Sequence, residues 1–111
     1  MAHNYKLRVI IKRPDERFGH VTNISDTLEN LQKTVEGPIE TVKLIDGAVL
    51  IVNEEGKLRG LEKNFFMGRP PFGDVIVGTV IVLGTKGDEF CDCPMEFKTW
   101  KWLLEIWGNT L

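Results

Sequence analysis

The sequence predicts an α+β fold: a mainly antiparallel sheet of five or six strands, one helix packed on it and a second helix at the C-terminal end. Three observations lead to this prediction. Apolar residues alternate along several short stretches, Asp46-Gly47 joins two of these stretches, and two segments repeat apolar residues at helical spacing. With 111 residues, the chain is expected to form one domain over residues 1–111 and to bury roughly two thirds of its unfolded surface.

The first two elements are expected to be strands of one hairpin. Apolar and charged side chains roughly alternate along residues 5–12, so one face should be buried and the other, which carries Lys12 and further basic residues around Ile10, should be polar. Residues 13–17 form a polar turn that contains Pro14. Residues 19–24 are then expected to return as a second strand beside the first.

A helix is expected between Asp26 and Glu36. Ser25 or Asp26 is a suitable N-cap, and Glu29 follows Asp26 at the spacing of a capping box. The helix should end at Gly37-Pro38, because glycine tolerates the left-handed conformation of a helix end and proline lacks the donor for a further turn. The apolar residues of its buried face are Leu28, Leu31 and Val35.

The middle of the chain predicts further strands. Residues 39–45 and 48–52 form a hairpin around Asp46-Gly47, and the second strand, apolar on both faces, should be central. Residues 65–73 contain prolines and glycines, so we expect an ordered loop or short helical turn whose phenylalanines cover the core or stack on a ligand. Residues 74–83 form one long central strand with a bulge or close approach at Gly78, and residues 89–92 a short edge strand.

The last element is a helix expected over about residues 94–107, starting at Cys93-Pro94. It carries more apolar surface than one sheet face covers, and exposed aromatic clusters often mark association sites. We therefore expect a homo-oligomer. The interface candidates are Trp100, Trp102, Leu103, Ile106 and Trp107.

Composition excludes several functions. With 14 basic and 16 acidic residues the net charge is −2, so generic nucleic-acid binding is not expected. No signal-peptide core and no membrane span is recognisable, which predicts a cytoplasmic protein. Cys91 and Cys93 are too close for an ordinary disulfide and too few for a structural zinc site, so neither a metal site nor a cofactor is expected.

The most informative stretch is residues 53–64, where glycines, amides and charges of both signs directly follow an apolar strand. It permits two interpretations: a hairpin turn with solvated charges, or a pocket in which cations meet phosphate and amides read a base or ribose edge. The sequence has no nucleophile and base in a recognisable catalytic context, so catalytic residues are not expected. The ligand-binding candidates are Asn53, Glu55, Lys57, Arg59, Asn64, Phe65 and Arg69.

From about Val9 to Trp107 the chain resembles a family of small uncharacterised proteins encoded by bacterial phages, prophages and mobile elements, known as a domain of unknown function. The most specific part is the block Asn53-Glu54-Glu55-Gly56 to Gly60-Leu61-x-x-Asn64, and a second part is residues 74–79. After Asn64 this chain has two phenylalanines where many members are more polar.

The resemblance implies a mobile-element setting and carries no activity. In that setting small non-enzymatic proteins often oppose host defences, which suggests sequestration of a small anionic, nucleotide-derived signalling molecule. The alternative is a protein-binding inhibitor of a host defence protein that acts through the tryptophan-rich C-terminal helix. An enzyme is the third and least supported class.

Overall fold

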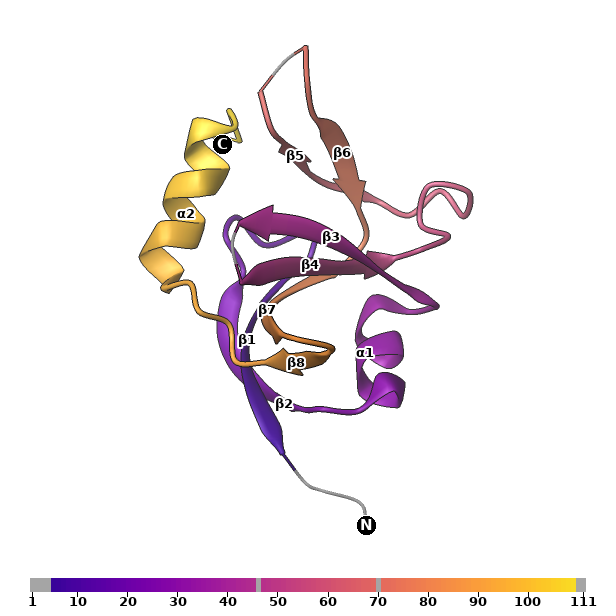
Figure 1. Cartoon of the computed structure of the whole chain (residues 1–111). Helices are drawn as coiled ribbons and strands as arrows, with labels where there is room; N and C mark the ends of the chain where they lie inside the picture. Colours follow the sequence, from indigo (N-terminus) through magenta and orange to yellow (C-terminus); the bar gives the residue numbers. More distant parts are fainter. Residues whose placement is uncertain (1–4, 46, 70, 110–111) are drawn as a thin grey trace.

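The computed structural model describes residues 5–45, 47–69 and 71–109. The fold is α+β, as the sequence predicts, with a mainly antiparallel sheet and two helices (Figure 1). The elements in chain order are β1 (Lys6–Lys12), β2 (His20–Ser25), α1 (Leu28–Val35), β3 (Ile39–Ile45), β4 (Ala48–Asn53), β5 (Lys63–Met67), β6 (Asp74–Val77), β7 (Val80–Lys86), β8 (Glu89–Cys91) and α2 (Phe97–Ile106).

The main sheet has the strand order β2-β1-β7-β4-β3, with β8 pairing the second half of β7. Both expected hairpins are confirmed: Lys6 pairs with Ser25 across β1 and β2, and Ile39 pairs with Asn53 across β3 and β4. Asp46 of the second turn lies outside the described residues, and Gly47 beside it has a φ of +81°. β4 and β7 are central strands, as their apolar composition predicts.

Alternate residues of a strand point to opposite faces, so the apolar central strands present side chains on both faces of the main sheet. Different elements cover the two faces. On one face, α1 packs Leu31 and Val35 against β1, β4 and β7. On the other face, α2 and the separate β5–β6 hairpin cover the sheet (Figure 1), and Trp100 is completely buried there. Burying a large aromatic side chain is worth about 1.5–3 kcal/mol, so this second core is a major source of stability.

Two expectations about residues 65–83 need correction. The first part of the expected loop belongs to β5, where Phe65 pairs with Ile76 and Phe66 with Val75. The expected long strand is broken at Gly78, so that its first part joins the β5–β6 hairpin and its second part is β7. Gly78 has a φ of +74°, and a Cβ there would lie 2.9 Å from Leu61 Cδ1, so the break needs glycine.

The helix ends also differ in detail from the expectation. The N-cap of α1 is Thr27, whose hydroxyl accepts from the Asn30 N–H at 3.1 Å, and the left-handed residue at its end is Glu36 rather than Gly37. α2 begins at Phe97 instead of Pro94, because the preceding residues run along β1: the Cys93 N–H donates to the Arg8 carbonyl at 2.8 Å.

No helix within the described ranges is long and apolar enough to cross a membrane.

Candidate functional site

The turn at residues 54–60, between β4 and β5, is held by hydrogen bonds to its neighbours. Asn53 is 5% exposed and uses its amide internally: Nδ2 donates to the Val35 carbonyl at 3.0 Å, and Oδ1 accepts from the Glu55 N–H at 2.7 Å. Arg59 Nη1 donates to the Glu36 carbonyl at 2.6 Å. Asn53 and Arg59 thus brace the end of α1, which identifies a structural role for both.

Lys57 points in another direction and pairs with Asp74 of β6, with Nζ 2.6 Å and 2.8 Å from the two carboxylate oxygens. The Lys57 ammonium is the main reason why the pKa of Asp74 is lowered. Arg69 is exposed and lies beyond the end of β5 at Met67. The cations among the predicted ligand-binding residues therefore do not converge on one point.

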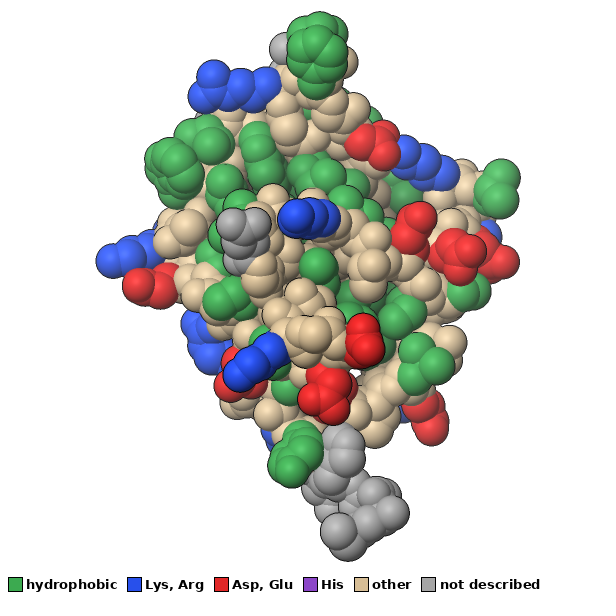
Figure 2. Space-filling model, viewed as in Figure 1, with side chains coloured by type: hydrophobic (Ala, Val, Ile, Leu, Met, Phe, Trp, Pro, Cys, Tyr) green, Lys and Arg blue, Asp and Glu red, His purple; other side chains and the backbone are tan. Residues whose placement is uncertain are grey.

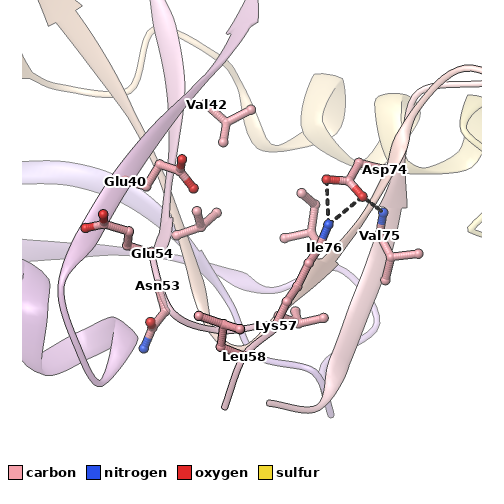
Figure 3. A pocket seen from close by; sticks show the side chains of 11 residues that line it. Glu40, Val42, Asn53, Glu54, Lys57, Leu58, Asp74, Val75 and Ile76 are labelled. Carbon is pink, nitrogen blue, oxygen red and sulfur yellow. Dashed lines mark hydrogen bonds and ion pairs between the residues drawn. The ribbon is translucent and has the colours of Figure 1, made fainter. Parts of the chain in front are cut away.

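A groove lies between β3 and β6 and beside this turn (Figure 3), with a cavity volume of about 160 Å³. We call it the β3–β6 groove. Pockets for small molecules usually measure about 300–1,000 Å³, so this groove is too small to enclose a nucleotide. Its lining residues are Glu40, Val42, Val52, Asn53, Glu54, Lys57, Leu58, Asp74, Val75, Ile76 and Val77.

A larger hollow of about 420 Å³ lies where the end of β1, the loop at residues 13–19, the start of β5 and the end of α2 meet. We call it the basic hollow. Among the described residues, three with cationic side chains line it and none with a carboxylate does. Its lining residues are Lys12, Pro14, Arg17, Lys63, Asn64, Phe65, Gly108 and Asn109.

Lys12 is the central residue of the basic hollow and is only 3% exposed. Its ammonium donates to the Glu16 carbonyl at 2.7 Å and to Asn64 Oδ1 at 2.6 Å. An ammonium has three N–H donors, and besides these two bonds the Lys12 ammonium lies 5.8 Å from the centre of the Phe65 ring. Burial lowers the pKa of Lys12, and the negative charges of Glu16 and Asp15 oppose this shift. An anion in the hollow would stabilise the charged form.

The loop that carries Arg17 is fixed by Glu16. One Glu16 carboxylate oxygen accepts from the Arg13 N–H at 2.9 Å, and the other lies 2.7 Å from His20 Nδ1. Partial burial raises the pKa of Glu16, but these hydrogen bonds and the charges of His20 and Arg13 outweigh it, so the pKa is lowered overall. Arg17 and Lys63 form no ion pair within the described part of the chain, and the Arg17 guanidinium lies 4.9 Å from the centre of the Phe18 ring.

Asn109, which follows the end of α2, lines the hollow and bonds to β5. Its Oδ1 accepts from the Phe66 N–H at 2.9 Å, and its Nδ2 donates to the Phe66 carbonyl at 2.7 Å. The side-chain amide therefore pairs with the outer edge of β5 as a neighbouring strand would. Gly108 allows this return of the chain with a φ of +85°.

Of the predicted ligand-binding residues, the structure places only Asn64 and Phe65 in the basic hollow. Asn64 is already bonded to Lys12 and Gly78, and Phe65 is 2% exposed with its ring stacked on Trp107 at 6.2 Å. Sequence reasoning missed Lys12, Arg17, Lys63 and Asn109. A signal for Lys12 was its position two residues after Ile10, which puts both on one strand face. This strand face was expected to be polar and exposed, but the structure buries both Ile10 and Lys12.

The predicted interface residues also fall into two groups. Trp100 (0% exposed) and Leu103 (9%) belong to the core between α2 and the sheet, because both α2 and the β5–β6 hairpin cover that face. Ile106 and Trp107 are partly buried against the same core. Trp102, at 57%, is the one of the five with a largely exposed side chain.

The free thiol of Cys91 lies beside a hollow with several acidic residues. Cys91 and Cys93 are free thiols, and burial raises the pKa of Cys93, which makes it a poorer nucleophile. A second hollow of about 480 Å³ contains Lys6 and four acidic side chains, Asp26, Asp88, Glu89 and Asp92. Nevertheless, the described residues contain no group of three or more His, Cys, Asp or Glu side chains that is placed to hold a metal ion.

Comparison with known proteins identifies the family. No curated protein and no solved structure matches the chain significantly. A family model described as a domain of unknown function, DUF3846, matches residues 7–104. The match covers most of the chain, from β1 into α2, and includes the residues of the basic hollow except Gly108 and Asn109. The chain therefore belongs to the DUF3846 family.

Proposed function

We propose that the protein binds a small phosphate-bearing ligand of nucleotide size in the basic hollow and holds it without chemical conversion. The observation that supports this proposal is that Lys12, Arg17 and Lys63 line one hollow, with no Asp or Glu among its described lining residues. Three cationic side chains attract anions, and a partly enclosed site strengthens that attraction, although Glu16 and Asp15 offset part of the charge of Lys12. The volume of about 420 Å³ falls within the range of small-molecule pockets.

Each cation has a distinct role in this proposal. The Arg17 guanidinium offers a planar fork that matches two phosphate oxygens, and Lys63 adds a second charge from β5. The buried Lys12 ammonium adds a third positive charge at the base of the hollow. Glu16 and Asn64 keep Lys12 in place before the ligand arrives, which reduces the entropy lost on binding.

Binding without turnover is the favoured form of this function. Among the described residues that line the basic hollow there is no Ser, Cys, His, Asp or Glu side chain. In this function its lysines bind phosphate and do not act as nucleophiles. In the mobile-element setting that the family resemblance implies, such a protein would sequester a nucleotide-derived signalling molecule of the host and so oppose a defence response. Sequestration requires affinity and no catalysis.

The test is thermal stabilisation of the purified protein by a panel of linear and cyclic nucleotides, with the matching nucleosides as uncharged controls. A ligand with dissociation constant Kd stabilises the fold by RT ln(1+[L]/Kd), which is about 2.7 kcal/mol at 100 times Kd. Arg17→Ala and Lys63→Ala should each reduce this stabilisation. Lys33→Ala removes one charge from α1, on the other side of the sheet, and should leave it unchanged.

Two outcomes would contradict the proposal. Equal stabilisation by nucleosides and nucleotides would show that phosphate is not recognised. Loss of binding in Arg59→Ala, with Arg17→Ala unaffected, would move the site to the turn at residues 54–60. Mass spectrometry of the recovered ligand distinguishes binding from catalysis, because a bound nucleotide should be released intact.

A second candidate is a protein-binding inhibitor that uses α2, and the exposed Trp102 favours it. Tryptophan is enriched among the residues that dominate interface energies. This function predicts capture of one host defence protein that is lost in Trp102→Ala while nucleotide stabilisation persists. Sedimentation of the same variant tests the expected homo-oligomer, which should dissociate if Trp102 forms the interface.

A further inference from the structure

The outer edge of β6 faces the β3–β6 groove and has no strand beside it among the described residues. Four consecutive residues, Asp74, Val75, Ile76 and Val77, line the groove. Successive side chains of a strand point to opposite faces, so four residues in a row line one cavity only when the strand presents its edge to it. Figure 3 shows this arrangement, with β6 on one wall and residues of β3 and β4 on the other.

The hydrogen bonds of β5 show which groups β6 offers. Phe66 directs its N–H and carbonyl away from β6, to the side chain of Asn109. Phe66 and Val75 therefore form a non-hydrogen-bonded pair of the antiparallel ladder, in which the N–H and carbonyl of both residues point away from the partner strand. The N–H and carbonyl of Val75 accordingly point toward the groove. The Val75 N–H is covered by Asp74 Oδ1 at 2.8 Å. This cap is an exposed side chain that a strand can replace.

The floor of the groove is apolar, and its volume suits one side chain. A cavity of about 150 Å³ with apolar walls is large enough to hold a benzene ring, and this groove measures about 160 Å³. Figure 2 shows apolar side chains gathered on this face between the β5–β6 hairpin and the main sheet. The apolar lining residues are Val42, Val52, Leu58, Val75, Ile76 and Val77.

The rim of the groove is acidic. Glu40, Glu54 and Asp74 contribute carboxylates, and Lys57 is already paired with Asp74. Glu40 and Glu54 form no ion pair within the described ranges of the chain, which leaves an excess of negative charge. The Lys57–Asp74 pair is about 60% exposed at both side chains, so it is weak and readily exchanged. A basic occupant is therefore favoured.

We propose that the β3–β6 groove binds an extended peptide segment of a partner protein, which adds as a strand to the edge of β6, inserts one apolar side chain and places basic residues against Glu40 and Glu54. Main-chain hydrogen bonds to Val75 supply affinity, and the small apolar cavity and acidic rim supply selectivity. The basic hollow lies on the β5 side of the same hairpin, so this inference does not depend on the proposed ligand.

The test is fluorescence anisotropy of a labelled heptapeptide in which lysine and valine alternate, titrated with the full chain up to about 1 mM. Binding should weaken as salt is raised, because exposed charges are screened. A peptide with glutamate in place of lysine should not bind. A lysine–valine peptide methylated on every backbone nitrogen should also fail, because it keeps the side chains and loses the N–H donors.

Variants of the protein locate the binding site. Both Glu40→Lys and Glu54→Lys should weaken peptide binding at least about tenfold, since each replaces a rim carboxylate by a cation. Glu105→Lys makes the same charge change on the exposed side of α2 and should bind as the native chain does. Circular dichroism verifies that each variant is folded.

Absence of binding, equal binding of the glutamate peptide or the methylated peptide, or equal effects of Glu54→Lys and Glu105→Lys would overturn the proposal. It would also be overturned if the chain forms a dimer that Glu54→Lys dissociates and that excludes the peptide, because the occupant would then be a second copy.

Discussion

The side-chain amide of Asn64 bonds to both the side chain and the main chain of Lys12: its Oδ1 accepts from the Lys12 ammonium at 2.6 Å, and its Nδ2 donates to the Lys12 carbonyl at 2.9 Å. Nδ2 also donates to the Gly78 carbonyl at 2.7 Å. One amide therefore connects the end of β1, the start of β5 and the break between β6 and β7. The same contacts keep a buried ammonium at the base of the basic hollow.

Replacing this amide should be costly. Asn64→Ala leaves the buried Lys12 ammonium with the Glu16 carbonyl as its remaining partner and removes a donor from the Lys12 and Gly78 carbonyls. Each buried polar group that loses its partner costs about 1–3 kcal/mol. We expect the free energy of unfolding, measured with urea, to fall by at least about 2 kcal/mol. Asn23→Ala removes an exposed amide on β2 and should change it by less than about 0.5 kcal/mol. Similar losses in the two variants would contradict the role of Asn64.

The stability should depend on pH through Lys12. Because burial lowers its pKa below the ordinary value of 10.5, the unfolded chain binds more protons than the folded one between the two pKa values. Stability should therefore rise as the pH increases through the folded pKa toward 10.5. Lys12→Met should lack this rise. Urea unfolding at a series of alkaline pH values measures the difference, and parallel curves for the two proteins would exclude the effect.

Two tryptophans on α2 should respond very differently to truncation. Trp100 is fully buried, contacts Phe65 and Trp107, and donates from Nε1 to the Phe18 carbonyl at 2.7 Å. Trp100→Ala should cost about 3–5 kcal/mol, because it leaves a cavity. Trp102 is 57% exposed, and Trp102→Ala should cost less than about 1 kcal/mol. Thermal unfolding provides the comparison, and equal losses would contradict the orientation of α2.

Glu36 is the non-glycine residue with a positive φ, 66°, within the described ranges. A left-handed conformation costs an ordinary L-residue about 1 kcal/mol, which glycine does not pay. Glu36→Gly should therefore stabilise the protein by up to about 1 kcal/mol and keep the Arg59 bond, which uses the main-chain carbonyl. Glu29→Gly, within α1, should destabilise it by about 1 kcal/mol. Chemical unfolding of both variants measures whether the free energy of unfolding rises or falls. A loss of stability in Glu36→Gly would refute this explanation.

Local patterns were sufficient for the elements whose residues interact mainly with chain neighbours. The β3–β4 hairpin follows from two β-rich runs around Asp46-Gly47, and α1 follows from the spacing of Leu31 and Val35. β5 could not be predicted in this way. Its sequence, with glycine and prolines close behind Phe65 and Phe66, has weak strand character, and the strand is stabilised by β6 on one edge and by Asn109 on the other.

Apolar periodicity reflects burial along each element, so the α+β class, the central position of β4 and β7, and the two amphipathic helices could be predicted from the sequence. Which polar residues meet could not be predicted, because it depends on how the elements pack together. The basic hollow combines residues from three separate places: Lys12 at the end of β1, Arg17 in a loop and Lys63 at the start of β5. They meet because Gly78 breaks the long apolar run and lets the β5–β6 hairpin fold across the sheet. Contacts between residues so distant along the chain leave no period in the sequence, so the basic hollow becomes visible only when the strands are assembled.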